Sequence, residues 1–284
     1  MLLAVGGITF EIFGETGPLP AELRPYLSPS SQADVVCRAR RGPVDPVDEE
    51  HLLFDSGEIW CLDEIEGGIR IVLRKGGPGG VPFQALELSD DLKNAVAIID
   101  SYIVPLDGEP FALREPALEL WACFLLMRGR GLLVHGCGLL GPDGVHVFAG
   151  QSGAGKSTLA GILTSAGAGT ILSDDRLVLR RRDGAVRVYG TPWHGEARYA
   201  SPASGDLSAL YFLEQAAGCE LVPLGRAEAA ARLAASCFMA GWPRVDLQNI
   251  LDQAAAIVEQ VPAHVLRFAP DRSLVAAIGL GVLP

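Results

Sequence analysis

The sequence predicts an α/β protein, in which a core with a mixed sheet and a glycine-rich loop follows a smaller, mainly β module. Three observations predict this fold class. Short apolar runs separated by Gly and Pro fill the first hundred residues. A strand, a glycine-rich turn and a helix start follow one another around residue 150. Neighbouring strands in this region are joined by hairpins, whereas an all-parallel sheet would need helical crossovers.

Composition is that of a globular protein with an acidic surface. The 284 residues are 49% hydrophobic, enough to fill one large core or a small and a medium one. The net charge of −11 argues against a broad nucleic-acid or acidic-membrane surface, so we expect neither as a partner. The first residues lack the positive flank of a signal peptide, and no apolar run reaches the roughly 18 residues of a membrane helix. We therefore expect a cytoplasmic protein.

The N-terminal module is expected to cover residues 1–115. Candidate strands alternate there with Gly- and Pro-rich turns, at residues 7–13, 33–39, 52–54, 58–62 and 68–73. The glycine-rich stretch 75–82 has no GK[ST] ending, so turn chemistry explains it better than phosphate binding. The prolines and polar residues of the stretch from Pro105 to Pro116 mark the boundary. A second domain is then expected at residues 116–284.

The second domain begins with an apolar helix over residues 117–127 and continues mostly with strands. Asp183-Gly184 is expected to form a hairpin turn. Strands are expected at residues 131–135, 145–149, 170–172, 177–180 and 186–189, with helices at 156–165, 226–239 and 247–259.

The glycine-rich loop matches the pattern GxxxxGK[ST] of a phosphate-binding loop, or P-loop. Its glycines allow backbone N–H groups to turn toward an anion, the Lys156 ammonium adds positive charge, and the Ser157 hydroxyl can hold Mg²⁺. A glycine turn without a ligand is less favoured, because apolar residues continue at helical spacing after the loop. We expect ATP and Mg²⁺ to be bound here, by Gly150, Ser152, Gly153, Ala154, Gly155, Lys156, Ser157 and Thr158.

Ser173-Asp174-Asp175 supplies two carboxylates one helix after the loop. Near Mg-ATP, one acid can bind the metal while the other accepts a proton from an attacking hydroxyl. An ordinary turn is the alternative. His135 ends the strand that should pair with residues 145–149, which would bring its ring toward the phosphates, although a lone histidine is more often structural.

These residues resemble the catalytic domain of the HPr kinase/phosphorylase family, whose P-loop core is akin to that of ATP-dependent phosphoenolpyruvate carboxykinase. The matching parts are His135-Gly136, the loop ending in Lys156-Ser157, and Asp174-Asp175-Arg176, and the resemblance spans roughly residues 130–195. It implies a mixed-sheet kinase core, ATP and Mg²⁺ as cofactors, and subunits that assemble into a homo-oligomer.

Two departures argue against HPr as the substrate and against the phosphorylase reaction. Thr158 stands where the family commonly has Glu, and the later RGxGIIxV-like signature has no counterpart. The segment 189–196 instead resembles HPr-kinase-related proteins of ribosomal-peptide and lasso-peptide biosynthesis, some of which phosphorylate a serine of a precursor peptide. His194 and Arg198 are therefore candidates for contact with the acceptor, and Arg176 and the arginines at 180–182 compete with Arg198 for that role.

The resulting hypothesis is transfer of the ATP γ-phosphoryl group to a hydroxyl, most plausibly a serine of a peptide or protein. Lys156 would hold the phosphates, Ser157 and Asp175 the Mg²⁺, and Asp174 would be the general base with His135 orienting it or the phosphoryl group. Kinase action on a small hydroxylated metabolite remains an alternative, as does a non-catalytic nucleotide-binding switch.

Overall fold

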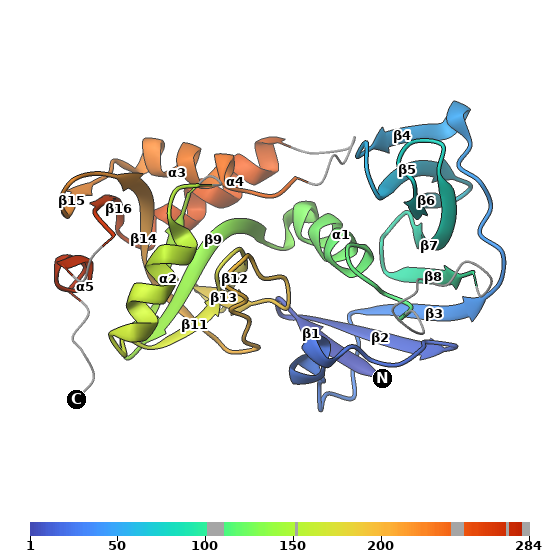
Figure 1. Cartoon of the computed structure of the whole chain (residues 1–284), viewed down its shortest axis with the longest axis horizontal. Coiled ribbons are helices and arrows are strands. Elements are labelled where there is room, and N and C mark those ends of the chain that lie inside the picture. The colour runs from blue at the N-terminus through green and yellow to red at the C-terminus, as the bar shows by residue number, and fades with distance from the viewer. Residues whose placement is uncertain (101–110, 151–152, 240–246, 271–272, 280–284) are drawn as a thin grey trace. The chain divides into compact units, whose positions relative to one another are not determined.

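The structure is a computed structural model that describes residues 1–100, 111–150, 153–239, 247–270 and 273–279 (Figure 1). The described residues form two compact units, one within Met1–Leu125 and the other within Leu126–Met239 together with the residues after 246. The units therefore divide after the helix at residues 117–125, whereas the sequence-based boundary lies before it.

The first unit is built on an eight-stranded mixed sheet with the order β1-β2-β3-β8-β7-β6-β5-β4. The β2–β3 and β3–β8 pairs are parallel and the other pairs are antiparallel. Its elements are β1 Leu2–Val5, β2 Ile8–Gly14, the 3₁₀ helix η1 Ala21–Tyr26, β3 Val35–Arg41, the 3₁₀ helix η2 Glu49–His51, β4 Leu52–Asp55, β5 Trp60–Ile65, β6 Gly68–Lys75, β7 Val81–Ser89, β8 Asn94–Ile99 and α1 Ala117–Leu125.

Helix α1 is buried along its whole length, and all of its residues except Glu119 are apolar. The Trp121 ring packs edge-on against Phe10, with ring centroids 5.1 Å apart, and its indole N–H donates to the Leu92 carbonyl at 2.9 Å. The glycine-rich stretch 75–82 lies at the turn between β6 and β7. Strands β1, β7 and β8 were not expected; in β7, Pro82 weakens the strand pattern.

The second unit holds another mixed sheet, with the order β10-β9-β12-β13-β14-β16-β15 and with β11 beside β9. Strands β9–β10 and β12–β13 form antiparallel hairpins, while β14 runs parallel to both β10 and β16. Its elements are the π-helical turn η3 Leu126–Arg130, β9 Leu132–Gly141, β10 Gly144–Ala149, α2 Lys156–Ser165, β11 Thr170–Ser173, β12 Arg176–Arg182, β13 Ala185–Gly190, β14 Ser204–Gln215, β15 Glu220–Pro223, α3 Arg226–Ala235, α4 Leu247–Val258, β16 Ala263–Phe268 and α5 Ser273–Ala277.

The core of the second unit lies where α2 packs along β9 and β11 (Figure 1). Leu159, Ala160 and Leu163 project from one face of α2 into a cluster that includes Phe148 of β10 and Leu274 of α5. On the expected hairpin turn, Asp183 and Gly184 have φ of 51° and 83°, as a turn with two left-handed residues requires.

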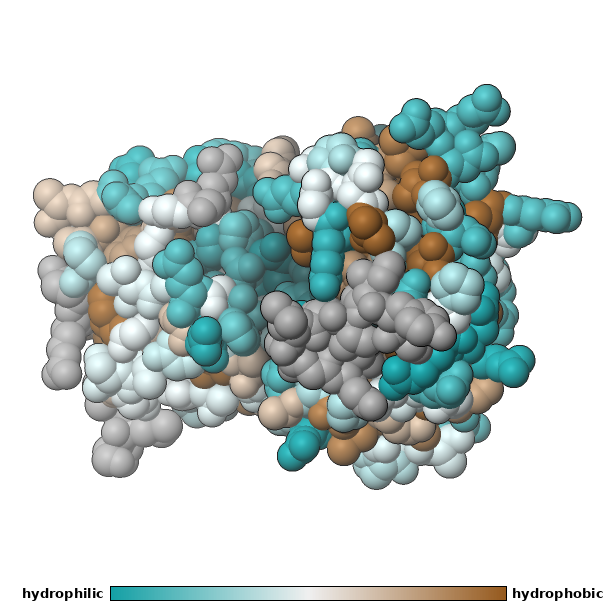
Figure 2. Space-filling model, turned by 45° about the vertical axis from the view of Figure 1, so that its right-hand side comes forward, coloured by the Kyte–Doolittle hydropathy of each residue, from teal (hydrophilic) through white to brown (hydrophobic). Residues whose placement is uncertain are grey.

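Large hydrophobic side chains at the surface are scattered. On the face shown in Figure 2, hydrophobic surface forms several separate patches among hydrophilic residues. Among the described residues, no helix is both long and apolar enough to cross a membrane. The exposed large hydrophobic residues are Met1, Phe13, Leu27, Leu52, Ile59, Val81, Met239, Leu247 and Leu251.

Candidate functional site

Strand β10 ends at Ala149 and helix α2 begins at Lys156, on either side of the glycine-rich loop. Gly153 and Gly155 have φ of 81° and 95°, a backbone conformation that residues with a side chain rarely adopt. A Cβ on Gly155 would also lie 3.0 Å from the Phe268 ring. The N-cap residue Gly155 has no side chain to cap the backbone N–H groups of the first turn of α2. Ser152 lies outside the described residues.

Lys156 is the first residue of α2 and is only 6% exposed. Its Nζ donates a hydrogen bond to the carbonyl of Gly150 at 2.8 Å, so the ammonium folds back over the loop. Burial lowers the pKa of Lys156, while the charge of Asp175 acts in the opposite direction and that of Arg176 adds to the lowering. The lysine therefore shares one electrostatic environment with these two residues.

The acidic pair lies at the bend between β11 and β12, which both run along β9. Ser173 sets this bend, because its hydroxyl accepts the N–H groups of Asp175 and Arg176 at 3.2 and 3.1 Å and donates to the Trp193 carbonyl. The register then places Arg176 opposite His135. Side chains distant in sequence meet here because β9 is their common neighbour.

Asp174 is an anchor for the loop over residues 191–200. Its carboxylate is 1% exposed and accepts three backbone N–H groups, from Gly195 at 2.9 Å, Ala197 at 3.0 Å and Tyr199 at 3.2 Å. A Cβ on Gly195 would lie 2.9 Å from the Asp174 carboxylate. Both carboxylate oxygens thus accept N–H groups from the backbone of this loop.

Asp175 is the carboxylate that meets the other expected site residues. His135 Nε2 lies 2.6 Å from its Oδ1, and Arg176 bonds to its Oδ2. Burial raises the pKa of Asp175, but the hydrogen bond from His135 and the charges of Arg176, His135 and Lys156 outweigh it, so the pKa lies below its ordinary value. His135 was expected to orient Asp174 or the phosphoryl group; of the two carboxylates, the one it contacts is Asp175.

Arg176 is held from a second side by Phe238, which the sequence did not single out. The guanidinium carbon lies 4.6 Å from the centre of the Phe238 ring. The residues after α3 are tied to β9, because His135 N–H donates to the Ser236 carbonyl and Phe238 N–H to that of Leu133, both at 2.8 Å. No motif marks Phe238, and only the fold brings it to the site.

The remaining candidates lie on exposed surface or at the far end of β12. His194 is exposed, with Nδ1 3.0 Å from the Gly195 carbonyl oxygen, and Arg198 is exposed with a left-handed φ of 59°. Both belong to the loop that Asp174 anchors. Arg180 is buried and donates to the Arg130 carbonyl, while Arg181 and Arg182 are exposed at the hairpin end.

Comparison with known proteins gives one family match. The model of the family described as SynChlorMet cassette protein ScmC matches residues 121–271, more than half of the 284 residues. The search of curated proteins finds no match. Among solved structures, the Hpr(Ser) kinase/phosphatase from Coxiella burnetii matches with 12% identity and a TM-score of 0.29, over 51% of this chain and 85% of that one. Both values are too low to support a functional conclusion.

Proposed function

This chain belongs to the SynChlorMet cassette protein ScmC family, and we propose that it is an ATP-dependent phosphotransferase. The reaction would move the γ-phosphoryl group to the hydroxyl of a serine in a peptide or protein, a ribosomal precursor peptide being the foremost candidate. The proposed core is of the HPr kinase and phosphoenolpyruvate carboxykinase type, on the motifs described above.

One observation supports this function most directly. The buried Lys156, at the start of α2, interacts electrostatically with the Asp175 carboxylate. That carboxylate is itself held by His135 and Arg176. Phosphoryl transfer needs these groups together, because the protein's task is to position the reactants and to neutralise charge on the transferred group. A site that only bound phosphate would not need the histidine and the carboxylate beside the lysine.

The residues present fit Mg-ATP. Lys156 would exchange its bond to the Gly150 carbonyl for phosphate oxygens, and the N–H groups at the start of α2 would face the same anion. Ser157 and Asp175 would hold Mg²⁺, which supplies positive charge to the phosphates. The lowered pKa of Asp175 keeps its carboxylate ionised for that task at neutral pH.

We assign the base to His135 and not to Asp174. With Nε2 bonded to Asp175, the Nδ1 atom of His135 is the ring nitrogen that takes the proton of the acceptor hydroxyl, and Asp175 stabilises the imidazolium that forms. Arg176 neutralises charge on the transferred group. Asp174 acts indirectly, by holding the loop that carries His194 and Arg198.

An exposed loop beside the acidic pair favours a polypeptide acceptor. Gly195 packs against the acidic pair, with its Cβ position 3.3 Å from that of Asp175, while its neighbour His194 remains exposed. A small metabolite would be better served by a closed pocket that buries most of its surface. His194 and Arg198 are therefore proposed as acceptor contacts.

Mass spectrometry tests the proposal. The protein is incubated with Mg-ATP and with serine peptides, serine-containing proteins or small hydroxylated metabolites, and Lys156→Ala and His135→Asn are run in parallel. A phosphate on a peptide or protein serine, present with the wild type and absent with both variants, is the expected result. Phosphate on a metabolite would establish metabolite kinase action, and ATP binding without transfer to any acceptor would favour the nucleotide switch.

A further inference from the structure

The glycine-rich loop is supported by residues near the ends of two neighbouring strands, β14 and β16. These strands run parallel, and their register pairs Gln215, the last residue of β14, with Phe268, the last residue of β16. A Cβ on Gly155 would lie 3.0 Å from the Phe268 ring, and a Cβ on Gly150 would lie 3.4 Å from the Cβ of Leu213. Close packing therefore restricts the backbone at these two glycines.

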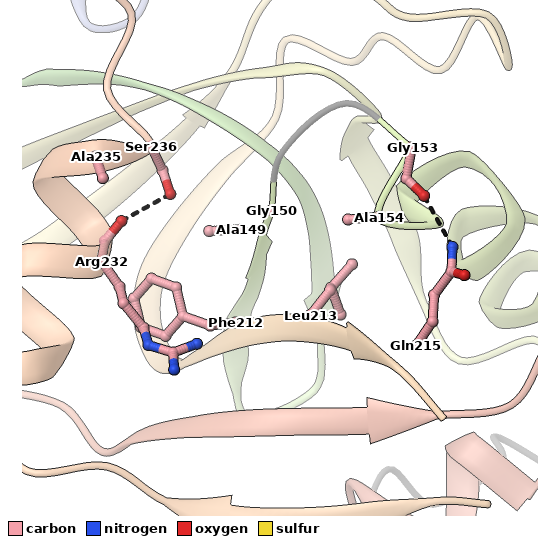
Figure 3. Close-up of a pocket in the computed structure, with 10 residues that line it drawn as sticks. All are labelled: Ala149, Gly150, Gly153, Ala154, Phe212, Leu213, Gln215, Arg232, Ala235 and Ser236. Carbon is pink, nitrogen blue, oxygen red and sulfur yellow. Dashed lines mark hydrogen bonds between the residues drawn. The ribbon is translucent and has the colours of Figure 1, made fainter. Parts of the chain in front are cut away.

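Gly153 is held differently from the other two glycines. Within the described part of the chain, no atom outside its chain neighbours lies within 4 Å of the position that a Gly153 Cβ would take. Its φ of 81° and its missing side chain let the following peptide unit rotate at low cost. The Gln215 side chain meets this part of the loop, because its Nε2 donates a hydrogen bond to the Gly153 carbonyl at 2.8 Å (Figure 3). A hydrogen bond, and not packing, thus orients this carbonyl.

The hydrogen bond from Gln215 also sets the direction of the next backbone N–H. The peptide unit between Gly153 and Ala154 is planar and trans, so its C=O and N–H groups lie on opposite edges. With the carbonyl turned toward Gln215, the Ala154 N–H is directed to the other side. Rotation of this unit by half a turn would place the carbonyl oxygen there, and an anion binds to backbone N–H groups, not to a carbonyl oxygen.

We propose that Gln215 is a positioning residue of the phosphate site, which holds the Ala154 N–H toward the phosphates of the nucleotide. The inference rests on the proposed function, because it needs an anion at the loop, and it adds a residue that lies outside the loop motif. Gln215 acts through the loop backbone and touches neither the phosphates nor the acceptor. A donor that is already oriented strengthens anion binding, since it needs no reorganisation when the ligand arrives.

Gln215→Met removes the donor and keeps a side chain of similar length. Gln215 is exposed, so the change leaves the core untouched. Calorimetric titration would measure the affinities for Mg-ATP and for Mg-tripolyphosphate, which carries the phosphates alone. We expect both affinities to fall by the same factor, roughly two- to tenfold, as the loss of one hydrogen bond would cause.

The Ala154 amide gives a readout that a merely structural role of Gln215 would not change. In protein labelled with nitrogen-15 alanine, the NMR signal of this amide is identified by its absence in Ala154→Gly. Saturating Mg-tripolyphosphate should shift its proton downfield in the wild type, because a hydrogen bond to phosphate deshields the proton. The shift at saturation should be smaller in Gln215→Met.

Gln248→Met is the matched control. Gln248 is also exposed, and its Nε2 donates one hydrogen bond of the same length, 2.8 Å, to Asp252 within α4. This variant should bind both ligands like the wild type, with the full Ala154 shift. The assignment is overturned if Gln215→Met keeps both affinities, weakens Mg-ATP alone, or weakens both ligands with a full Ala154 shift. Equal weakening in Gln248→Met would overturn it as well.

The proposed function can fail independently of Gln215. A wild type that binds both ligands, loses affinity and Ala154 shift in Gln215→Met and phosphorylates nothing would keep the positioning role and contradict the kinase. A wild type that binds neither ligand would overturn both.

Discussion

Asp174 and Asp175 are adjacent and chemically identical, yet the fold gives them different tasks. Asp174 points into the loop over residues 191–200 and satisfies three of its N–H groups, while Asp175 faces His135 and Arg176. The sequence marks the pair as candidate site residues but does not show how their contacts differ, because those contacts depend on which way each side chain leaves the bend after Ser173.

Asp174→Asn should therefore mainly lower the free energy of unfolding. The amide replaces one accepting oxygen with a donor, so at least one loop N–H loses its partner, at a cost of about 1–3 kcal/mol. Urea unfolding would measure this loss, and turnover below the unfolding range should be better preserved than in Asp175→Asn. If Asp174→Asn kept wild-type stability but transferred no phosphoryl group, Asp174 and not His135 would be the general base.

Phe238→Leu probes the aromatic support of Arg176. Leucine keeps an apolar contact but removes the ring face, an interaction of about 0.5–2 kcal/mol with the guanidinium. If Arg176 stabilises the transferred phosphoryl group, kcat should fall roughly 2- to 30-fold with little change in KM for ATP. Phe238→Tyr retains the ring and should retain kcat. Equal losses in both variants would show that Phe238 only packs.

At the level of elements, the sequence correctly predicted a helix and a turn whose formation depends on residues close together in the chain. Helix α2 has the expected bounds, and the hairpin at Asp183-Gly184 forms where the turn residues require it. Strand β14 was missed because Leu210, Tyr211, Phe212 and Leu213 are all buried, so the alternation of a half-buried strand is lost. The anchored loop was also beyond prediction, since Asp174 and its N–H donors lie more than 20 residues apart.

Gly195→Ala tests whether the anchored loop serves the acceptor. The added Cβ would lie 2.9 Å from the Asp174 carboxylate, so the loop must move away from its anchor. We expect a raised KM for the acceptor peptide, several-fold or more, with unchanged affinity for Mg-ATP, measured by steady-state kinetics and by titration.

Gly161→Ala provides the control for a glycine that nothing crowds. Gly161 lies inside α2 with open space at its Cβ position, so alanine should stabilise the helix by about 0.5–1 kcal/mol and leave the acceptor KM unchanged. If Gly195→Ala also leaves that KM unchanged, the loop does not contact the acceptor.

For the whole molecule, two compact units imply two folding reactions that nucleotide should affect differently. All residues assigned to Mg-ATP lie in the second unit, and a ligand stabilises only the unit that binds it. Scanning calorimetry should therefore resolve two transitions, of which one rises with Mg-ATP. At a ligand concentration of one hundred times Kd, that unit gains about 2.7 kcal/mol.

Lys156→Ala identifies the responding transition. It should abolish the rise with Mg-ATP while leaving the transition of the first unit where it was, because Lys156 belongs to the second unit alone. A single transition that moves as a whole with Mg-ATP would mean that the units unfold as one cooperative body. In that event nucleotide binding would stabilise the first unit together with the second, although the first unit holds none of the residues assigned to Mg-ATP.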